Sequence, residues 1–272
     1  MTRRLVVFPC GGAKLYGMLD CGPAHGQTGL LIVSGGNEIR AGAFGGHAAL
    51  AARLADHAGV PVFRFDRRGI GDSEGENHGW RGSRDDIAAA LGSFRAALPG
   101  MRRIIAYGLC DAASALMLHG PGLPGLEGLV LANPWTLDDD TDTHTDTDLG
   151  HSPQALRQRY LAKLADPRAV LRLVSGRVDL RRLMRGLGRA AQPGAPPSPL
   201  AMSLHDSLAR FSAPVTVLVA RGDRIGAQFL AVWPGPDPRV QVHQGHSHGF
   251  TDDPDSRDWL FQHLVEATAS RH

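Results

Sequence analysis

Short apolar runs alternate along the chain with stretches whose polar and apolar positions suit helices. The run at Leu30–Val33 is continuous, as expected of a strand buried on both faces of a parallel sheet. The runs predicted as strands are Leu5–Phe8, Leu15–Asp20, Leu30–Val33, Val60–Phe65, Arg103–Tyr107, Leu129–Ala132, Pro214–Ala220 and Val240–Val242. The stretches predicted as helices are 47–57, 83–98, 112–118 and 255–269. This alternation predicts the α/β class, with a doubly wound, mostly parallel sheet whose ligands lie at the strand carboxyl ends.

The alternation stops between Thr136 and Phe211. The tract 138–148 holds six aspartates, but a calcium loop of the EF-hand type needs glycine and glutamate where Thr143 and Leu149 stand. We therefore interpret the tract as a solvated loop. Residues 152–186 are predicted to be helical with arginines on a solvated face, and the Pro-rich run 192–199 is predicted to be a linker. Residues 1–135 and 212–272 would then form the core, and 136–211 a helical cap insertion.

Composition narrows the function classes. The 272 residues carry a net charge of +2, from 29 Lys+Arg and 27 Asp+Glu, so no basic field indicates binding to nucleic acid. The three cysteines have no metal-ligand spacing, which favours reduced thiols in the cytoplasm. No run approaches the roughly 18 apolar residues of a membrane helix, and the apolar start of the chain is too short for a signal peptide. We expect a cytoplasmic protein that does not insert into membranes.

The stretch 107–113 is the most informative part of the chain. It joins a predicted strand to a predicted helix, which is the context of a nucleophile elbow. Cys110 has small residues two positions before and after it, Gly108 and Ala112, as the sharp turn requires. Asp111 fits less well, because the residue two positions before it is a leucine. Cys110 is thus the predicted nucleophile, and the start of a helix favours its thiolate form; Cys10 and Cys21 are predicted to be structural.

An acid and a histidine follow Cys110 along the chain in the order that α/β hydrolases use. Asp223 comes directly after the predicted strand 214–220, and His248 follows the last predicted strand. His248 would take the thiol proton and later activate water, while Asp223 would orient the imidazole. The alternatives that stay open are His246 for the histidine and Asp72 and Asp138–Asp140 for the acid.

Backbone N–H groups near Cys110 predict an oxyanion hole. One donor would be the N–H of Asp111, and the other that of Gly36 in the loop after the strand 30–33, with Asn37 as the next candidate. The Asp111 side chain is interpreted as an acid that favours the helix start. Asn37, Arg40 and Trp135 are predicted as possible substrate-binding residues.

Several motifs resemble those of the α/β-hydrolase superfamily, and more narrowly those of the exosortase A system-associated hydrolases of type 1. They are Phe65–Asp66, Arg68–Gly69, Gly71–Gly75, Gly108–Ala115, Asn133–Trp135 and Leu173–Leu180. The resemblance implies a bacterial cytoplasmic hydrolase encoded with exopolysaccharide and protein-sorting systems. It also implies an acid at Asp223 and a histidine at His248. The tract 138–148 and Ser247 depart from the family pattern, which tends to have an aspartate before the histidine.

Together these features predict a hydrolase that needs neither cofactor nor metal. It would cleave the ester or thioester of a small-molecule acyl substrate through an acyl-cysteine intermediate. Thioesters, activated esters and lactones suit it better than amides, because a thiolate leaves readily from a tetrahedral intermediate. Acyl transfer to another acceptor and a non-catalytic binding role on the same fold are the alternatives.

Overall fold

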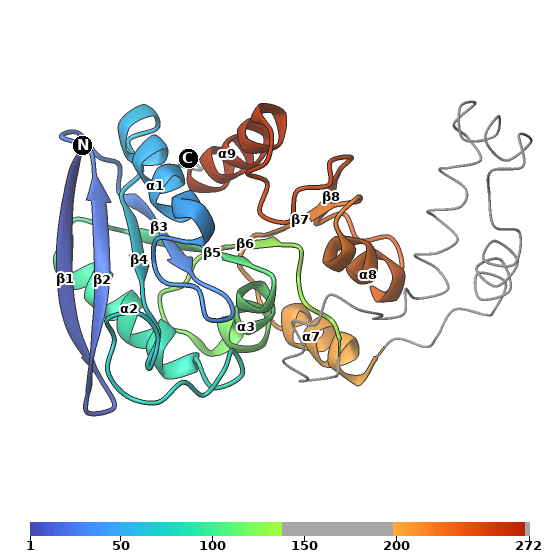
Figure 1. Ribbon diagram of the computed structural model, residues 1–272, viewed down its shortest axis with the longest axis horizontal. Coiled ribbons are helices and arrows are strands. Elements are labelled where there is room, and N and C mark those ends of the chain that lie inside the picture. Colours follow the sequence, from blue (N-terminus) through green and yellow to red (C-terminus); the bar gives the residue numbers. More distant parts are fainter. Residues whose placement is uncertain (138–197, 270–272) are drawn as a thin grey trace, which may run out of the picture.

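The computed structural model describes residues 1–137 and 198–269, and in these residues eight strands form one sheet (Figure 1). The strands are β1 Thr2–Cys10, β2 Ala13–Cys21, β3 Thr28–Val33, β4 Val62–Phe65, β5 Arg103–Leu109, β6 Leu129–Ala132, β7 Val215–Ala220 and β8 Val240–His243. Their order is β1-β2-β4-β3-β5-β6-β7-β8. β1 and β2 are antiparallel to their neighbours, and β3 to β8 are parallel to one another. The predicted mostly parallel α/β sheet is confirmed.

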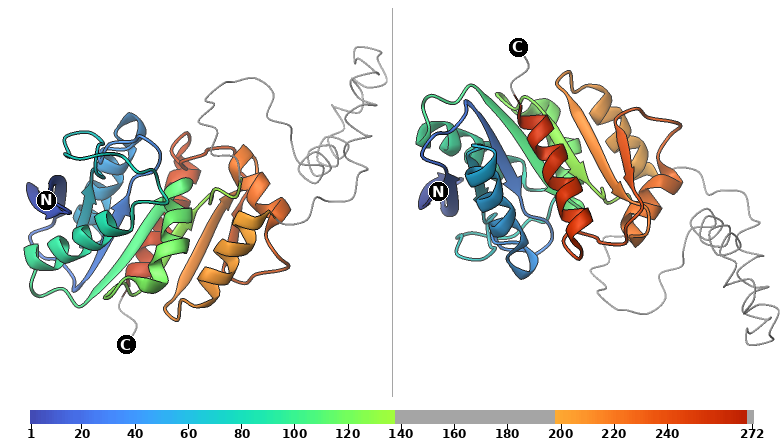
Figure 2. Two further views of the ribbon diagram at one scale, coloured as in Figure 1. Left: turned by 90° about the horizontal axis from the view of Figure 1, so that it is seen from below. Right: turned by 90° about the horizontal axis from the view of Figure 1, so that it is seen from above.

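Helices cover both faces of this sheet (Figure 2). They are α1 Gly46–His57, α2 Arg84–Ala97, α3 Asp111–His119, α7 Pro199–Ala209, α8 Arg224–Val232 and α9 Pro254–Thr268. On one face, Leu54 of α1 and Leu264 of α9 pack with Leu30 and Ile32 of β3. On the other face, α2, α3, α7 and α8 pack in a second apolar cluster. Because both faces are covered, Leu30–Val33 of β3 and the whole of β6 are apolar without alternation.

The starts of α2 and α8 each have a feature that the predicted elements do not include. The hydroxyl of Ser83 does not cap α2 but donates to Trp80 O at 2.6 Å. The carboxylate of Asp86 accepts from the backbone N–H and the guanidinium of Arg68, so it is not available for a capping box. The second feature is α8, which was not predicted, because it is short and begins directly after a strand-end aspartate. At α2, a contact with the distant Arg68, and not local spacing, determines where the Asp86 side chain lies.

Helix α7 changes the expected boundary between core and insertion. Pro199, predicted as part of a linker, lies in the first turn of this helix, and the Ser198 hydroxyl caps it by accepting from Ala201 N at 3.1 Å. Leu204 and Leu208 are fully buried in the core cluster. The second half of the core therefore begins at α7 and not at residue 212. The acidic tract, the predicted helical stretch 152–186 and the family-like segment 173–180 lie outside the described residues.

The two ends of the described chain that flank 138–197 lie side by side. The hydroxyl of Ser198 donates to Thr136 O at 2.9 Å. Thr136 is itself buried and follows the turn after β6. Among the helices of residues 1–137 and 198–269, none is both long enough and apolar enough to cross a membrane.

Candidate active site

Cys110 stands at a strained turn between β5 and α3. Its backbone has φ 59° and ψ −121°, a conformation that costs a residue with a side chain about 1 to 3 kcal/mol. The small neighbour is required, since a Cβ added at Gly108 would lie 2.7 Å from the backbone of Ala112. Strand, strained residue and helix follow one another without a loop. This is the geometry that the sequence predicts for a nucleophile elbow.

The segment after β6 holds this turn in place. Cys110 N donates to Ala132 O at 2.9 Å, and Trp135 N donates to Cys110 O at 3.2 Å. The buried hydroxyl of Ser114 in α3 donates to Trp135 O at 2.7 Å. The indole N–H of Trp135 donates to Leu137 O, so its polar atom supports the chain that leaves the core. These bonds fix the elbow against the neighbouring strand.

Asp223 and His248 meet beside the elbow. Asp223 follows β7 and caps α8, and its Oδ2 accepts from Gly226 N at 2.9 Å and lies 3.0 Å from His248 Nδ1. Asn133, which is fully buried at φ 40°, fixes the histidine loop. Its amide donates to His248 O at 2.7 Å and accepts from Ala220 N at 2.8 Å. One buried asparagine thus connects the ends of β6 and β7 to the histidine.

The electrostatics favour a charged histidine. Burial lowers the pKa of His248, but its hydrogen bonds to Asp223 and to the side chain of Cys110 outweigh burial and raise that pKa to about 10. At Asp223, burial raises the pKa, and the hydrogen bond and charge of His248 reverse this and lower it. The three side chains predicted as a triad are therefore brought into contact, with an imidazolium between two acidic groups.

The alternative residues lie elsewhere. His246 is exposed, with its ring over Gly222, where an added Cβ would collide with it. The Asp72 carboxylate forms an ion pair with Arg40 at 2.7 Å, and Arg40 also binds the buried carboxylate of Asp66. The guanidinium of Arg40 is thus engaged within the loops, and Asp138–Asp140 lie outside the described residues. Among the predicted substrate-binding residues, Asn37 is exposed and accepts from Asn77 Nδ2 at 3.1 Å.

The loop after β3 faces the elbow, but its predicted donor is already engaged. Gly36 N lies 2.9 Å from Asp111 Oδ1 and 2.8 Å from Oδ2. The carboxylate also covers Gly35, because an added Cβ there would collide with Oδ1. Gly36 and Asp111 are therefore adjacent, through the Asp111 carboxylate, and the oxyanion hole formed by their backbone N–H groups stays a prediction. The Asp111 side chain, however, is not simply an acid at a helix start, since it binds the Gly36 N–H.

Two charged residues near the elbow were not found from the sequence. Arg67 is 3% exposed and its guanidinium donates to Gly36 O. Glu38 lies close enough to His248 and Asp111 for their charges to affect it; burial raises its pKa, and His248 opposes that rise. The only local signal was that both residues follow a predicted strand end. In residues 1–137 and 198–269, no cluster of histidine, cysteine and acidic residues is arranged to hold a metal ion.

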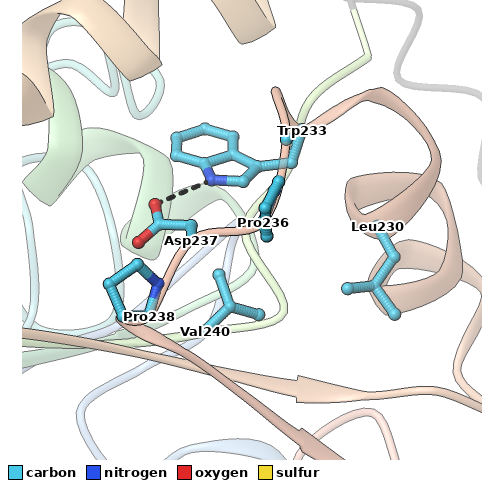
Figure 3. Close-up of a pocket in the computed structure, with 7 residues that line it drawn as sticks. Leu230, Trp233, Pro236, Asp237, Pro238 and Val240 are labelled. Atoms are coloured by element: carbon cyan, nitrogen blue, oxygen red, sulfur yellow. Dashed lines mark hydrogen bonds between the residues drawn. The ribbon is translucent and has the colours of Figure 1, made fainter.

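A pocket of about 430 Å³ opens at the other end of α8, away from Asp223. It is lined by Leu230, Trp233, Gly235, Pro236, Asp237, Pro238 and Val240. Figure 3 shows the Trp233 indole donating to Asp237, at 3.1 Å, and Asp237 also pairs with Arg239 at 2.7 Å. The lining contains no side chain of the elbow, so this pocket is separate from the site around Cys110.

Comparison with known proteins places this geometry in context. The profile described as "Alpha/beta hydrolase family" matches residues 25–258. A search of curated proteins finds no match.

Solved structures with a similar fold include an esterase, Pf2001, from Pyrococcus furiosus, with a TM-score of 0.62 and 14% identity over 98% of this chain and 92% of that one. An alpha-beta serine hydrolase homologue from Coxiella burnetii has a TM-score of 0.58 and 15% identity over 99% of both chains. Est1E from Butyrivibrio proteoclasticus, with bound ferulic acid, has a TM-score of 0.58 and 14% identity over 97% of this chain and all of that one (100%). At these identities, the likeness shows a shared fold.

Proposed function

This chain belongs to the alpha/beta hydrolase family and is a hydrolase, and from that premise we propose that it cleaves an ester or thioester with Cys110 as nucleophile. The observation that carries the proposal is the position of His248, which contacts Cys110 on one side and Asp223 on the other. A thiol, an imidazole and a carboxylate in this order can form a covalent acyl intermediate.

Acylation begins from the ion pair of the Cys110 thiolate and the His248 imidazolium. The thiolate attacks the carbonyl carbon, and the carbonyl oxygen becomes an oxyanion. This oxyanion would accept hydrogen bonds from the backbone N–H groups of Asp111 and Gly36. When the oxyanion collapses, the bond to the leaving oxygen or sulfur breaks, and the imidazolium donates its proton to that atom.

Deacylation uses the same residues with water as the nucleophile. Formation of the acyl-cysteine removes the thiolate, which is one of the groups that raise the pKa of His248. The neutral imidazole can then take a proton from water, whose oxygen attacks the acyl carbon. Asp223 stabilises the imidazolium that forms, and the Cys110 sulfur leaves the tetrahedral intermediate as a thiolate, which restores the starting ion pair.

The nucleophile restricts the substrate class. A thiolate leaves a tetrahedral intermediate more readily than an amine does, so amides would mostly return to starting material. Thioesters, activated esters and lactones have leaving groups that compete with the thiolate. Pf2001, which shares the fold, is named as an esterase, and we carry that substrate class into the proposal.

Mass spectrometry of the intact protein tests the covalent step. The purified protein is incubated with a panel of acyl esters and thioesters of different chain lengths, and adducts are located by peptide mapping. We expect an acyl adduct on Cys110 and none in C110A. If the panel leaves Cys110 unmodified while products are released, another nucleophile does the chemistry.

Alkylation gives a test that needs no substrate. Burial and the neighbouring Asp86 raise the pKa of Cys10 to about 11, and burial raises that of Cys21. Both are buried thiols near neutral pH, whereas Cys110 is partly exposed beside an imidazolium. Iodoacetamide should therefore label Cys110 at least about 100-fold faster than the other two. Equal labelling of the three thiols in the folded protein would contradict an activated Cys110.

The narrower family is also a proposal. The cysteine elbow 108–115 and the segment 65–75 support a place among the exosortase A system-associated hydrolases of type 1. Deletion of the gene in its host should then alter exopolysaccharide production or protein sorting, and a C110A copy should fail to restore the wild-type phenotype. Full restoration by C110A would instead favour a binding role without catalysis.

A further inference from the structure

The Asp111 carboxylate occupies the N–H group that the proposed mechanism needs for its oxyanion. Both carboxylate oxygens lie within 2.9 Å of Gly36 N. Gly36 lies in the exposed loop after β3, which faces the elbow through this contact. An oxyanion hole works only when its donors point at the place where the substrate oxygen becomes charged. In this arrangement a carboxylate already fills that place at Gly36, and a second anion beside it would be repelled.

Arg67 offers the carboxylate another partner. Its side chain is buried, and its terminal nitrogen donates to Gly36 O of the same loop. Among the residues that the structure describes, its Nε–H has no hydrogen-bond partner. A buried charged donor without a partner destabilises the position in which it is held. Of the acids whose charge raises the pKa of Arg67, Asp111 has the largest effect. A carboxylate that can accept from the Arg67 Nε–H therefore lies close by.

We infer that Asp111 is a two-position residue that controls substrate access to the oxyanion hole. In the resting position its carboxylate binds the Gly36 N–H. In the second position it binds the Nε–H of Arg67, which frees the Gly36 N–H for the substrate carbonyl. This inference rests on the proposed acyl chemistry of Cys110, because it assigns the oxyanion of that reaction to the Gly36 N–H.

The charges around Asp111 are consistent with a carboxylate that moves at low cost. Burial raises its pKa, and the Gly36 N–H, Arg67 and the backbone N–H groups at the start of α3 only partly offset this. Glu38, from the loop after β3, adds a like charge nearby. The resting position is thus a poor site for an anion. A purely structural Asp111 would instead brace the loop after β3 on α3, and the two roles predict opposite effects of its removal.

Hydrogen exchange of the Gly36 amide tests the resting position without reference to activity. Although Gly36 is an exposed residue, its N–H should exchange slowly in the wild-type protein because a carboxylate holds it, and at least about tenfold faster in D111A. D111N is the matched control, since its amide oxygen can still accept the bond. Equal exchange in wild type and D111A would overturn the inference, whatever the activity of the variants.

The acylation rate tests the control of the hole. D111A keeps the backbone N–H of residue 111 and opens Gly36, so its acylation rate constant should rise by about tenfold, within the 100- to 1,000-fold that one donor can contribute. A bracing role predicts a fall in rate together with a fall in Tm. A slower D111A with an unchanged Tm would likewise overturn the inference.

A double-mutant cycle tests the second position. R67K keeps a cation near Gly36 O but removes the Nε–H. It should slow acylation at least about fivefold more in the wild-type background than in D111A, because only a protein with Asp111 needs the receiving donor. Damage to the loop alone would slow both backgrounds equally, and that result overturns the role of Arg67.

The two proposals can fail separately. If no ester or thioester acylates Cys110 although Gly36 exchanges slowly, the proposed function fails and the assigned role of Asp111 fails with it. Normal acylation with fast exchange of the Gly36 amide overturns the inference about Asp111 alone.

Discussion

Two strand–helix junctions meet at this site, and each places an aspartate at the start of a helix. At the β7–α8 junction, Asp223 caps the helix and contacts His248. At the β5–α3 junction, Asp111 is the first helical residue and contacts the Gly36 N–H. Burial raises the pKa of both carboxyls, but that of Asp223 is lowered overall and that of Asp111 stays raised. A helix N-terminus alone therefore does not decide the charge of an acid; the partner across the site does.

Removing the sulfur at the β5–α3 junction should have the largest effect. C110A loses the nucleophile, so kcat/KM for an ester or thioester should fall by about 10⁴-fold or more. Steady-state rates with the best substrate of the panel measure this. C21A is the control, because the buried Cys21 thiol donates only to the backbone of Gly22, and its rate should stay within about twofold. Comparable losses in both variants would point to unfolding and not to chemistry.

Neutralising the acid at the β7–α8 junction should come next. D223N removes the charge that holds the imidazolium, and kcat should fall by about 10³- to 10⁴-fold. The asparagine oxygen can still accept from Gly226 N, so the helix cap and Tm should change little. D237N is a matched control from the far end of α8. A D223N enzyme with wild-type kcat would separate this junction from the chemistry.

Loosening the link between the two junctions should have an intermediate effect. Asn133 connects the histidine loop to the end of β7 without touching the reacting atoms. N133A should lower kcat by about 10- to 100-fold with little change in KM, because the His248 ring stays in the protein but is no longer held in position beside Cys110. The pH profile should also shift, since a displaced ring loses contact with Asp223. Loss of activity with an unchanged profile would indicate general damage to the fold.

The pH dependence should give the smallest and most specific effect. With the His248 pKa raised to about 10, the protonated form needed for acylation persists through neutral pH. The acylation rate should fall about tenfold per pH unit only above that value. The free energy of unfolding should change in the same direction as the rate. The contribution of His248 to it is complete below the ordinary pKa of histidine and is lost as the pH rises through about 10. D223N should move the descending limb to lower pH, and a limb that stays in place would contradict the contact.

Local patterns in the sequence predict the backbone of the site well. The turn at Cys110 follows from the spacing of Gly108 and Ala112, because only small residues allow the strand to pass so close to the helix. The parallel sheet follows from continuous apolar strands, and the order of the three candidate residues from their place after strand ends. Each of these features depends on neighbours in the sequence or on the general rules of parallel sheets.

Contacts between distant segments could not be predicted in the same way. The Asp111 carboxylate meets Gly36 across 75 positions, and Asn133 meets His248 across 115. Which way these side chains turn depends on the burial and charge that the assembled loops create. The start of α7 is a similar case. A proline-rich run by itself indicates a linker, and only the packing of α7 against α3 shows that Pro199 belongs to a helix of the core. The predicted and observed sites therefore agree in their strands and helices and differ mainly in which groups the side chains bind.

The hydrogen bond between Ser198 and Thr136 has a consequence for the evolution of this protein. The polypeptide leaves the hydrolase core after Leu137 and rejoins it at Ser198, beside Thr136. Thr136 directly follows Trp135, whose backbone N–H donates to the elbow residue Cys110. Lengthening a connection whose two ends lie side by side costs only about 0.6 kcal/mol per doubling. We therefore expect a change in the number of residues between 137 and 198 to leave the hydrogen bonds around the elbow intact.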